Sequence, residues 1–422
     1  MSGEQSPDVI VVGAGVIGLA IADSLAEAGQ KVLVLDRRDA RAGGASVANA
    51  GWINPYTLVP LPSRGAVKMG LTSFAKPTSP LYIRPRLSIG LAWWLLGFTA
   101  ASDAATFARG RAALVALGHD GGRRYLELEE RLPGLRRNAA ASLTVYSTPG
   151  GAAAAAAGEL AEIAGAGPVP EHELLDGDGA RAIEPMLGAR AQSGLLVHGD
   201  LQIEPASILE VLAGSVLERG GRIAQDTEVL GLLRSGDRVT GVRTTAGEHR
   251  AGSVIIAAGA WSPELLAPLG VRLRMEPGKG YSVTLRVPTV PRQVLALGEV
   301  KVGAVPHGGR TRLVGTMELS GVNERVDDRR VAAIVTAARP YLRPLETADD
   351  PLALIDEVHV GMRPMFANGL PVIDRVADGL FVSTGHAMMG VTLALSSATA
   401  LRDYLLEGRR PAVLEPFRLR RA

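Results

Sequence analysis

Residues 8–36 constrain the fold more than any other part of this 422-residue chain. They begin with a short continuous apolar run, Asp8–Gly13, the pattern of a strand buried on both faces. A glycine-rich turn, Gly13–Gly18, leads into a stretch of helical periodicity that ends at Gly29. A second apolar run, Lys31–Asp36, has the pattern of another buried strand. Together these segments predict a βαβ unit.

The glycine-rich turn follows the spacing Gly13-x-Gly15-x-x-Gly18. Gly13 permits the tight turn, Gly15 lets the backbone approach a pyrophosphate, and Gly18 lets the helix pack closely on the strand. The helix N-terminus supplies free N–H groups and a positive dipole end for phosphates. Asp36 ends the second strand, where a carboxylate can accept hydrogen bonds from the ribose hydroxyls. The unit therefore predicts dinucleotide binding and leaves the identity of the dinucleotide open.

Composition excludes several classes of function. The chain contains no cysteine, which rules out disulfides, thiolate metal sites, cysteine nucleophiles and cysteinyl-linked cofactors. Its seven histidines show no pair at metal-ligand spacing, so no metal site is expected. Lys and Arg number 45 against 43 Asp and Glu, and the resulting net charge of +2 gives no electrostatic footprint for nucleic acid.

The longest uncharged run, Leu87–Ser102, is shorter than the roughly 20 apolar residues that span a bilayer. It predicts a buried or interface helix, or else a membrane-resting surface carrying Trp93 and Trp94. The arginines between Arg409 and Arg421 form a basic tail, either a solvated chain end or a segment attracted to anionic lipid. We expect a cytoplasmic protein, with peripheral contact to the inner face of the membrane as the alternative.

Two downstream blocks add further α/β pattern. A helix is expected at 205–218 and a buried strand at 253–259. A strand at 380–383 and a helix at about 390–406 form the second block. An alanine-rich stretch at 152–164 predicts one more helix.

These patterns predict an α/β fold, α+β overall, with two discontinuous domains. Segments 1–65, 203–273 and 355–422 would assemble a Rossmann-like nucleotide-binding domain. Segments 66–202, which is helix-rich, and 274–354, which alternates like sheet, would assemble a second domain.

The motifs together resemble the D-amino acid oxidase superfamily of FAD enzymes, and within it bacterial D-amino acid dehydrogenase. The resemblance extends from Asp8 to Arg409 and rests on the βαβ unit and on the segments Gly44–Gly51, Pro277–Ser282, Gly361–Pro364 and Thr384–Gly390. It implies bound FAD and a substrate domain built on an antiparallel sheet plus helices.

Carried over residue by residue, the resemblance assigns cofactor contacts along the whole chain. The expected FAD-binding residues are Gly13, Ala14, Gly15, Val16, Ile17, Gly18, Asp36, Arg37, Arg38, Gly44, Ala45, Ser46, Asn49, Ala50, Gly51, Val229, Ala258, Gly259, Trp261, Gly385, Met388, Met389, Gly390, Val391 and Thr392.

Three residues are expected in the substrate site. Arg363 matches the arginine that binds the substrate carboxylate, and its planar fork suits that group. Tyr281 matches a tyrosine of the substrate pocket, with an ordinary strand aromatic as the alternative. His386 lies in the flavin loop and either orients substrate or makes a structural hydrogen bond.

The resemblance implies oxidation of the Cα–N bond of a D-amino acid to the imino acid by hydride transfer to flavin N5. Ala387, Met388 and Met389 stand where smaller or polar residues are common, which favours an apolar or cyclic, proline-like substrate. The acceptor is expected to be a quinone, an electron-transfer protein or oxygen.

Alternatives remain open at this point. One is a flavin amine oxidase acting on glycine, sarcosine or another N-substituted amino acid. Another is an FAD-binding subunit of a multi-chain dehydrogenase. A tRNA-modifying flavoprotein is disfavoured by the even charge balance.

Overall fold

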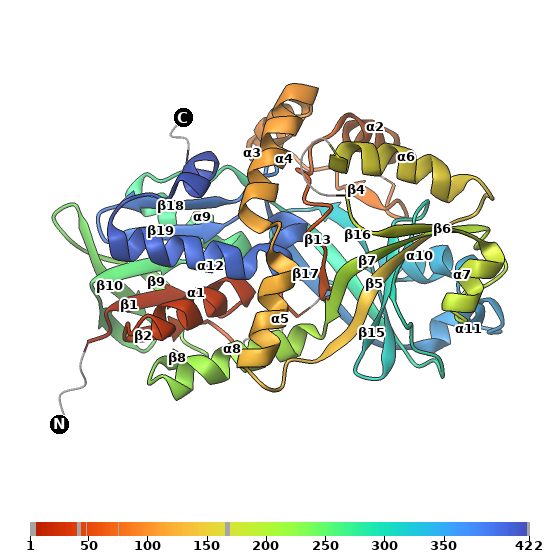
Figure 1. Ribbon diagram of the computed structural model, residues 1–422. Coiled ribbons are helices and arrows are strands. Elements are labelled where there is room, and N and C mark those ends of the chain that lie inside the picture. Colours follow the sequence, from red (N-terminus) through yellow and green to blue (C-terminus); the bar gives the residue numbers. More distant parts are fainter. Residues whose placement is uncertain (1–5, 40–43, 48, 75, 165–168, 420–422) are drawn as a thin grey trace.

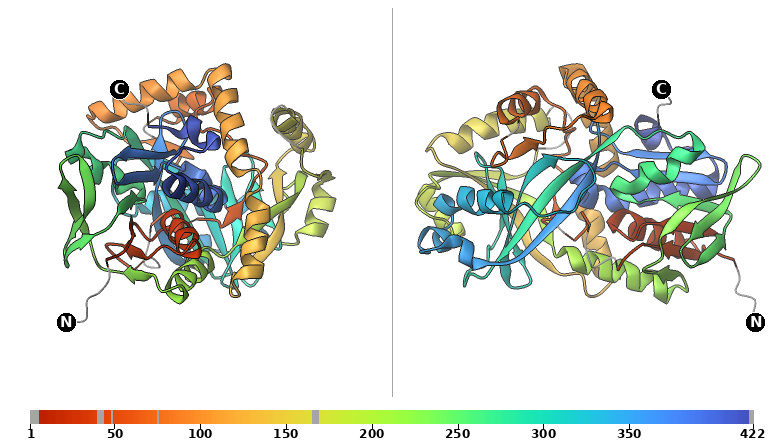
Figure 2. Two further views of the ribbon diagram at one scale, coloured as in Figure 1. Left: turned by 60° about the vertical axis from the view of Figure 1, so that its left-hand side comes forward. Right: turned by 180° about the vertical axis from the view of Figure 1, so that it is seen from behind.

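The computed structural model describes residues 6–39, 44–47, 49–74, 76–164 and 169–419. Figure 1 shows two halves side by side, each built around a large sheet. The half that carries the N-terminus holds a six-stranded sheet, and the other half holds a ten-stranded sheet. Figure 2 shows the same division from two further directions.

The six-stranded sheet is parallel except for one edge strand, which runs antiparallel to its neighbour. Its strands, in spatial order, are β18 (Val372–Ala377), β19 (Leu380–Thr384), β12 (Ser253–Ile256), β1 (Val9–Val12), β2 (Val32–Leu35) and β8 (Arg222–Ala224). β1 and β2 pair in parallel on either side of helix α1 in the chain, which confirms the βαβ unit.

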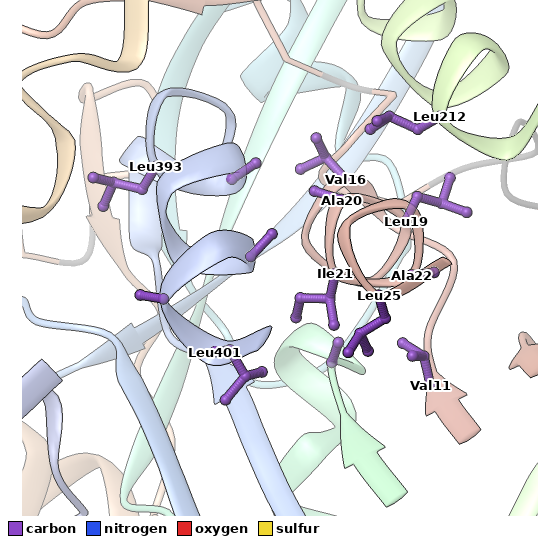
Figure 3. Close-up of a cluster of buried hydrophobic side chains, with 14 of the residues drawn as sticks. Val11, Val16, Leu19, Ala20, Ile21, Ala22, Leu25, Leu212, Leu393 and Leu401 are labelled. Atoms are coloured by element: carbon purple, nitrogen blue, oxygen red, sulfur yellow. The ribbon is translucent and has the colours of Figure 1, made fainter. Parts of the chain in front are cut away.

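β1 is buried on both faces, as its uninterrupted apolar pattern predicts. Val9 and Val11 point into a core formed with helices α1 (Val16–Glu27), α8 (Pro205–Glu218) and α12 (Gly390–Glu407). Figure 3 shows this core, in which Leu212 of α8 lies beside α1, whereas Leu393 projects from the side of α12 that faces away from α1. The three helices therefore cover one face of the sheet.

The opposite face of the six-stranded sheet is covered by a small antiparallel sheet. Ile10 and Val12 of β1 pack there against Val239 and Val242. The elements on this side are β9 (Val229–Ser235), β10 (Arg238–Thr244), β11 (Gly247–Arg250) and α9 (Ser262–Leu266).

The ten-stranded sheet is mostly antiparallel, with two parallel pairings, β14 with β5 and β16 with β4. Its strands, in spatial order, are β17 (Ile355–Phe366), β13 (Met275–Leu285), β16 (Arg310–Leu319), β15 (Val302–His307), β14 (Val294–Leu297), β5 (Arg137–Tyr146), β7 (Ser193–Ile203) and β3 (Trp52–Ile53), with β4 (Leu81–Ile83) on β16 and β6 (His172–Asp176) on β7.

The remaining helices lie around this second half and between the halves (Figures 1 and 2). They are α2 (Arg64–Ser73), α3 (Ile89–Ala101), α4 (Ala104–Gly118), α5 (Gly121–Arg131), α6 (Gly151–Ala164), α7 (Gly177–Ile183), α10 (Asp328–Ala338) and α11 (Arg343–Glu346). The alanine-rich stretch forms α6, as its composition predicts.

Segment 66–202 is helix-rich, as expected, and it also supplies the long strands β5 and β7. Segment 355–366 forms β17, an edge strand of the ten-stranded sheet, although the sequence grouped it with the nucleotide-binding segments. The division into two discontinuous domains stays a proposal, and β17 is the element that joins them.

Candidate functional site

A cavity lies where the two large sheets meet. It is lined by the carboxyl ends of four parallel strands, at Val12, Leu35, Ala257 and Ser383. β13 and β17 of the ten-stranded sheet close it from the other side. Ligands of open α/β sheets bind in the crevice outside the carboxyl ends of the strands, so this cavity is the candidate site.

The glycine turn lies at the floor of the cavity, and Gly13 and Gly18 have no space for a Cβ. Gly13 has a φ of 109°, and a Cβ there would lie 2.5 Å from the carbonyl oxygen of Ala257. A Cβ on Gly18 would lie 1.8 Å from the Gly13 carbonyl oxygen, so α1 packs directly on the turn. The first turn of α1 therefore lines the cavity at Val16 and Ile17, the kind of helix start that favours phosphate groups.

Asp36 joins the end of β2 to this turn. Its Oδ2 accepts a hydrogen bond from the Ala14 N–H at 2.7 Å, and its Oδ1 accepts one from the Arg38 N–H at 3.1 Å. A carboxylate has about four acceptor positions, so both oxygens retain capacity for ligand hydroxyls. Next to it, the Arg37 guanidinium lies 4.0 Å from the centre of the Trp261 ring and forms one wall.

Arg363 lies on β17 at the opposite end of the cavity. Its side chain crosses Gly280 on the neighbouring strand β13, where a Cβ would lie 2.2 Å from Nη1 and 2.4 Å from Cζ. Its Nη1 donates to the Thr316 carbonyl oxygen at 3.1 Å. Thr316 has a φ of 63° and stands where the pairing of β13 with β16 shifts register.

The Arg363 guanidinium has unused donors. Within the described ranges it forms no ion pair with a carboxylate. Burial lowers its pKa to about 10, which leaves it charged at neutral pH. A buried cation without an anionic partner is costly, and the arrangement therefore fits a carboxylate brought by a ligand.

The chain matches the family model described as DAO, FAD dependent oxidoreductase, over residues 8–404. It belongs to this family. The motif resemblance to the D-amino acid oxidase superfamily is confirmed, and the chain is an FAD-dependent oxidoreductase. The flavin cannot be cysteinyl-linked, because the sequence contains no cysteine.

Two relatives resemble the chain over nearly their whole lengths. The D-amino acid dehydrogenase of Cereibacter sphaeroides strain ATCC 17029 is 34% identical over 414 residues, covering 96% of this chain and 93% of that protein. The D-amino acid dehydrogenase of Rhizorhabdus wittichii is 31% identical over 415 residues, covering 96% and 97%.

Solved structures share the fold. Glycine oxidase from Geobacillus kaustophilus superimposes with a TM-score of 0.72 at 24% identity, covering 99% of both chains. L-proline dehydrogenase from P. horikoshii superimposes with a TM-score of 0.75 at 16% identity, covering 98% of this chain and 97% of that one. At these identities the likeness shows the fold alone, and it confirms the predicted fold class.

The segment Gly44–Gly51 fits a role in holding FAD. Asn49 Nδ2 donates to the carbonyl oxygens of Ala45 and Ser46, at 2.9 and 2.7 Å, and its Oδ1 accepts from the Gly51 N–H at 2.7 Å. Ser46 Oγ accepts from the Val16 N–H at 2.9 Å, which fixes the loop on the start of α1. These bonds shape a backbone cradle beside the glycine turn, where the FAD pyrophosphate would be held.

Twenty of the sequence-predicted site residues line the cavity. They are Gly13, Gly15, Val16, Ile17, Asp36, Arg37, Arg38, Gly44, Ala45, Ser46, Asn49, Val229, Ala258, Gly259, Trp261, Met388, Gly390 and Val391, with Arg363 and His386.

Eight predicted residues do not line it, namely Ala14, Gly18, Ala50, Gly51, Gly385, Met389, Thr392 and Tyr281. Several of them shape the surroundings instead. A Cβ on Gly51 would lie 1.8 Å from the Ile203 carbonyl oxygen, and one on Gly385 would lie 2.3 Å from the Phe366 ring. Met389 packs against the core around α1 rather than toward the cavity.

Tyr281 points away from the cavity. Successive side chains of a strand alternate between faces, and Gly280 of β13 occupies the cavity face. The Tyr281 hydroxyl donates to Glu318 Oε2 at 2.9 Å, and Lys279 Nζ lies 3.0 Å from the other oxygen of that carboxylate. Within the structure, Tyr281 belongs to a buried polar cluster behind the sheet.

His386 lines the cavity but is neutral. Burial lowers its pKa to about 3, and its Nε2 lies 3.1 Å from Ser397 Oγ. The His386 segment also forms an isolated β-bridge with Met365 on β17. This geometry supports the structural interpretation of His386 over an acid–base role.

The structure adds lining residues that the sequence analysis did not name as contacts. Gly280 and Gly361 line the cavity on β13 and β17, and they lie in the motif segments Pro277–Ser282 and Gly361–Pro364. Glu228, just before Val229, and Glu264 in α9 also line it. Glu264 carries no sequence signal, because its position depends on how α9 folds back onto the end of β12.

Proposed function

We propose that this chain is an FAD-dependent D-amino acid dehydrogenase. The proposed reaction oxidises the Cα–N bond of a D-amino acid to the imino acid. The observation that carries the proposal is the charged Arg363, which lines the cavity and forms no ion pair with a carboxylate among the described residues. The relatives of 31–34% identity that bear this name over nearly full length support the same conclusion.

Arg363 would hold the substrate carboxylate through two parallel N–H···O bonds. Its position is set by Gly280 beneath it and by the Thr316 carbonyl oxygen beside it. When bound, FAD supplies the hydride acceptor for the α-hydrogen. The chain fixes which face of Cα is presented and keeps the site dry, and its contribution is orientation rather than a side-chain nucleophile.

The side chains at the entrance support an apolar substrate. Ala387 and Met388 line the cavity next to His386, and Met388 is exposed to solvent. A flexible apolar side chain at this position suits a D-amino acid with an apolar or cyclic, proline-like side chain.

We further propose that electrons pass to a quinone, an electron-transfer protein or oxygen. None of the helices in the described ranges is long and apolar enough to cross a membrane. We propose a cytoplasmic location with peripheral contact to the inner membrane face. A cysteine-free fold does not depend on an oxidising compartment, which is compatible with that location.

The test is the visible spectrum of the purified holoprotein before and after anaerobic addition of D- and L-amino acids, D-proline, D-hydroxyproline, glycine and sarcosine. We expect bleaching of the oxidised flavin by D-enantiomers alone, followed by slow reoxidation on admission of air. Bleaching by glycine or sarcosine with rapid reoxidation would support an amine oxidase instead. A yellow protein that no amine bleaches would refute the proposed substrate class and indicate an FAD-binding subunit.

A further inference from the structure

Helix α3 presents an apolar face to solvent. Its residues Ile89–Ala101 include no charged side chain. The inner side is buried, with Trp94 only 5% exposed, whereas Trp93 is 60% exposed and Ile89 79% exposed on the outer side. A helix that is apolar all round is normally buried all round, so the outer face of α3 lacks a matching environment.

The exposed apolar area extends beyond α3. Its large side chains are Leu71 and Phe74 at the end of α2, Leu87 before α3, and Ile89, Trp93 and Leu96 on α3. Figures 1 and 2 place α2 and α3 along the same edge of the molecule. We call these six residues with their two helices the α2–α3 surface. Apolar patches that gather in this way mark interaction sites.

The sequence segment that carries these helices contains charges of one sign. No aspartate or glutamate occurs between Asp39 and Asp103. The exposed cations in the described part of this segment are Arg64, Lys68, Lys76, Arg84 and Arg86. Arg86 pairs with Glu276 of the neighbouring strand β13, and the other four form no ion pair within the described ranges.

On α2 the cations and the apolar residues share one exposed face. Arg64, Lys68 and Leu71 follow one another at spacings of four and three residues, and all three are exposed. The face is therefore amphipathic in the sense required at a membrane surface, with cations beside inserted apolar side chains.

We propose that the α2–α3 surface rests on an anionic lipid bilayer. The apolar side chains would enter the boundary between headgroups and acyl chains, with Trp93 at the depth that tryptophan favours. The flanking cations would lie among anionic headgroups. A second copy of this chain fits less well, because a two-fold interface would bring the exposed cations Arg64, Lys68, Lys76 and Arg84 of one copy against those of the other.

The C-terminal arginines are partly engaged within the chain. Arg410 is engaged with Asp374, and Arg418 pairs with Glu415, whereas Arg409 is exposed. Arg420 and Arg421 lie outside the described residues. Membrane attraction through the basic tail stays an alternative contact.

The bilayer contact would place the proposed dehydrogenase site close to a membrane, and in this respect it rests on the proposed function. Trp94, on the inner side of α3, donates its Nε1 hydrogen to the Met365 carbonyl oxygen at 2.9 Å. Met365 lies two residues beyond Arg363 on β17 and bridges to His386. A bilayer on the outer side of α3 would thus lie one helix away from the strand that holds the substrate arginine, within reach of a lipid-soluble acceptor.

The test is flotation of the full-length holoprotein with vesicles of phosphatidylcholine alone or of phosphatidylcholine and phosphatidylglycerol mixed 70:30. We expect binding to the mixed vesicles that the double variant Ile89→Ser/Trp93→Ser weakens at least about tenfold. The double variant Lys68→Glu/Arg84→Glu should weaken binding to the mixed, anionic vesicles about fivefold or more for each cation replaced. It should not change binding to phosphatidylcholine vesicles. Leu174→Ser/Leu217→Ser is the matched control, since these leucines are 53% and 54% exposed elsewhere, and it should bind like wild type.

A direct readout is quenching of tryptophan fluorescence by brominated lipid, which Trp93→Phe should remove. Binding unaffected by Ile89→Ser/Trp93→Ser would overturn the proposal. So would an absence of vesicle binding combined with a dimer that this variant dissociates, which would assign the surface to a second copy. Turnover of a D-amino acid with a water-soluble dye as acceptor should be equal in wild type and variants. If the proposed function is wrong, this dye assay fails for all of them while vesicle binding is unchanged.

Discussion

Gly280→Ala is the substitution that tests the site most sharply, because it adds one methyl group directly beneath Arg363. The new Cβ would lie 2.2 Å from Nη1 and 2.4 Å from Cζ and Nη2. Ordinary contacts begin near 3.4 Å, so the guanidinium must withdraw by about 1.2 Å, the difference between 3.4 and 2.2 Å. The backbone of β13 at this position is extended and tolerates alanine.

A misplacement of about 1 Å costs on the order of 100-fold in rate where catalysis depends on orientation. We therefore expect kcat/KM for the best D-amino acid to fall about 100-fold, equivalent to about 2.7 kcal/mol of transition-state stabilisation. FAD content should stay at the wild-type level, because the glycine turn and the Gly44–Gly51 loop are untouched. Anaerobic stopped-flow bleaching of the flavin measures the substrate effect, and the visible spectrum measures FAD content.

A double-mutant cycle with Arg363→Lys separates this mechanism from general damage to the strand. If Gly280→Ala acts through the guanidinium, its cost should nearly vanish once the planar fork is gone. Gly315→Ala, on the adjacent strand, is the control, since its Cβ would meet nothing closer than 3.3 Å. The reasoning is refuted if Gly280→Ala leaves kcat/KM within about threefold of wild type, or if its cost adds fully to that of Arg363→Lys.

Four further outcomes follow from the site. Gly13→Ala should yield a colourless protein, since its Cβ would lie 2.5 Å from the Ala257 carbonyl oxygen at a φ of 109°, and retained yellow colour would contradict this. Tyr281→Phe should change kcat/KM less than about twofold and cost about 1 kcal/mol of stability in urea denaturation, whereas a tenfold loss of activity would return the hydroxyl to the substrate site. The affinity of a simple carboxylate inhibitor should fall as the pH rises through about 10, where Arg363 loses its charge, and an affinity that stays constant there in spectral titrations would count against this role. His386 has a folded pKa of about 3 and an ordinary value of 6.5, so only the unfolded state gains a proton as the pH falls below 6.5. The free energy of unfolding should then drop by about 1.4 kcal/mol per pH unit, and His386→Gln should reduce this slope in urea titrations between pH 7 and 5.

The cofactor half of the site is predictable from sequence because its determinants are local. Strand β1, the glycine turn, α1 and β2 lie within thirty residues, and each carries its own periodicity or spacing signal. Asp36 reaches the turn simply because β2 pairs with β1 in parallel register. The same logic accounts for α12, whose N-terminal end follows β19 after the short segment 385–389.

The substrate half could not be predicted in the same way. β13 is buried on both faces, so alternation along it cannot tell which face meets the cavity. That choice depends on pairing with β17, more than seventy residues later, and on the register shift at Thr316. Tyr281 therefore looked like a pocket residue in its motif, while the neighbouring Gly280 is the residue that faces Arg363. Strand β5 was not predicted for a different reason, because its alanines and serine have low strand propensity.

The apolar exterior of α3 and the position of Arg363 are connected through β17. The inner side of α3 packs in one cluster with Met365, Leu319 and Ala387, and its Trp94 is hydrogen-bonded to the same strand end. Replacing Trp94 on the inner side by a small polar residue would leave a cavity next to β17. The exposed side chains on the outer side contribute little to the packing of the fold. Packing among the described residues therefore does not account for the large apolar side chains on the outer side, and the bilayer contact supplies the missing environment.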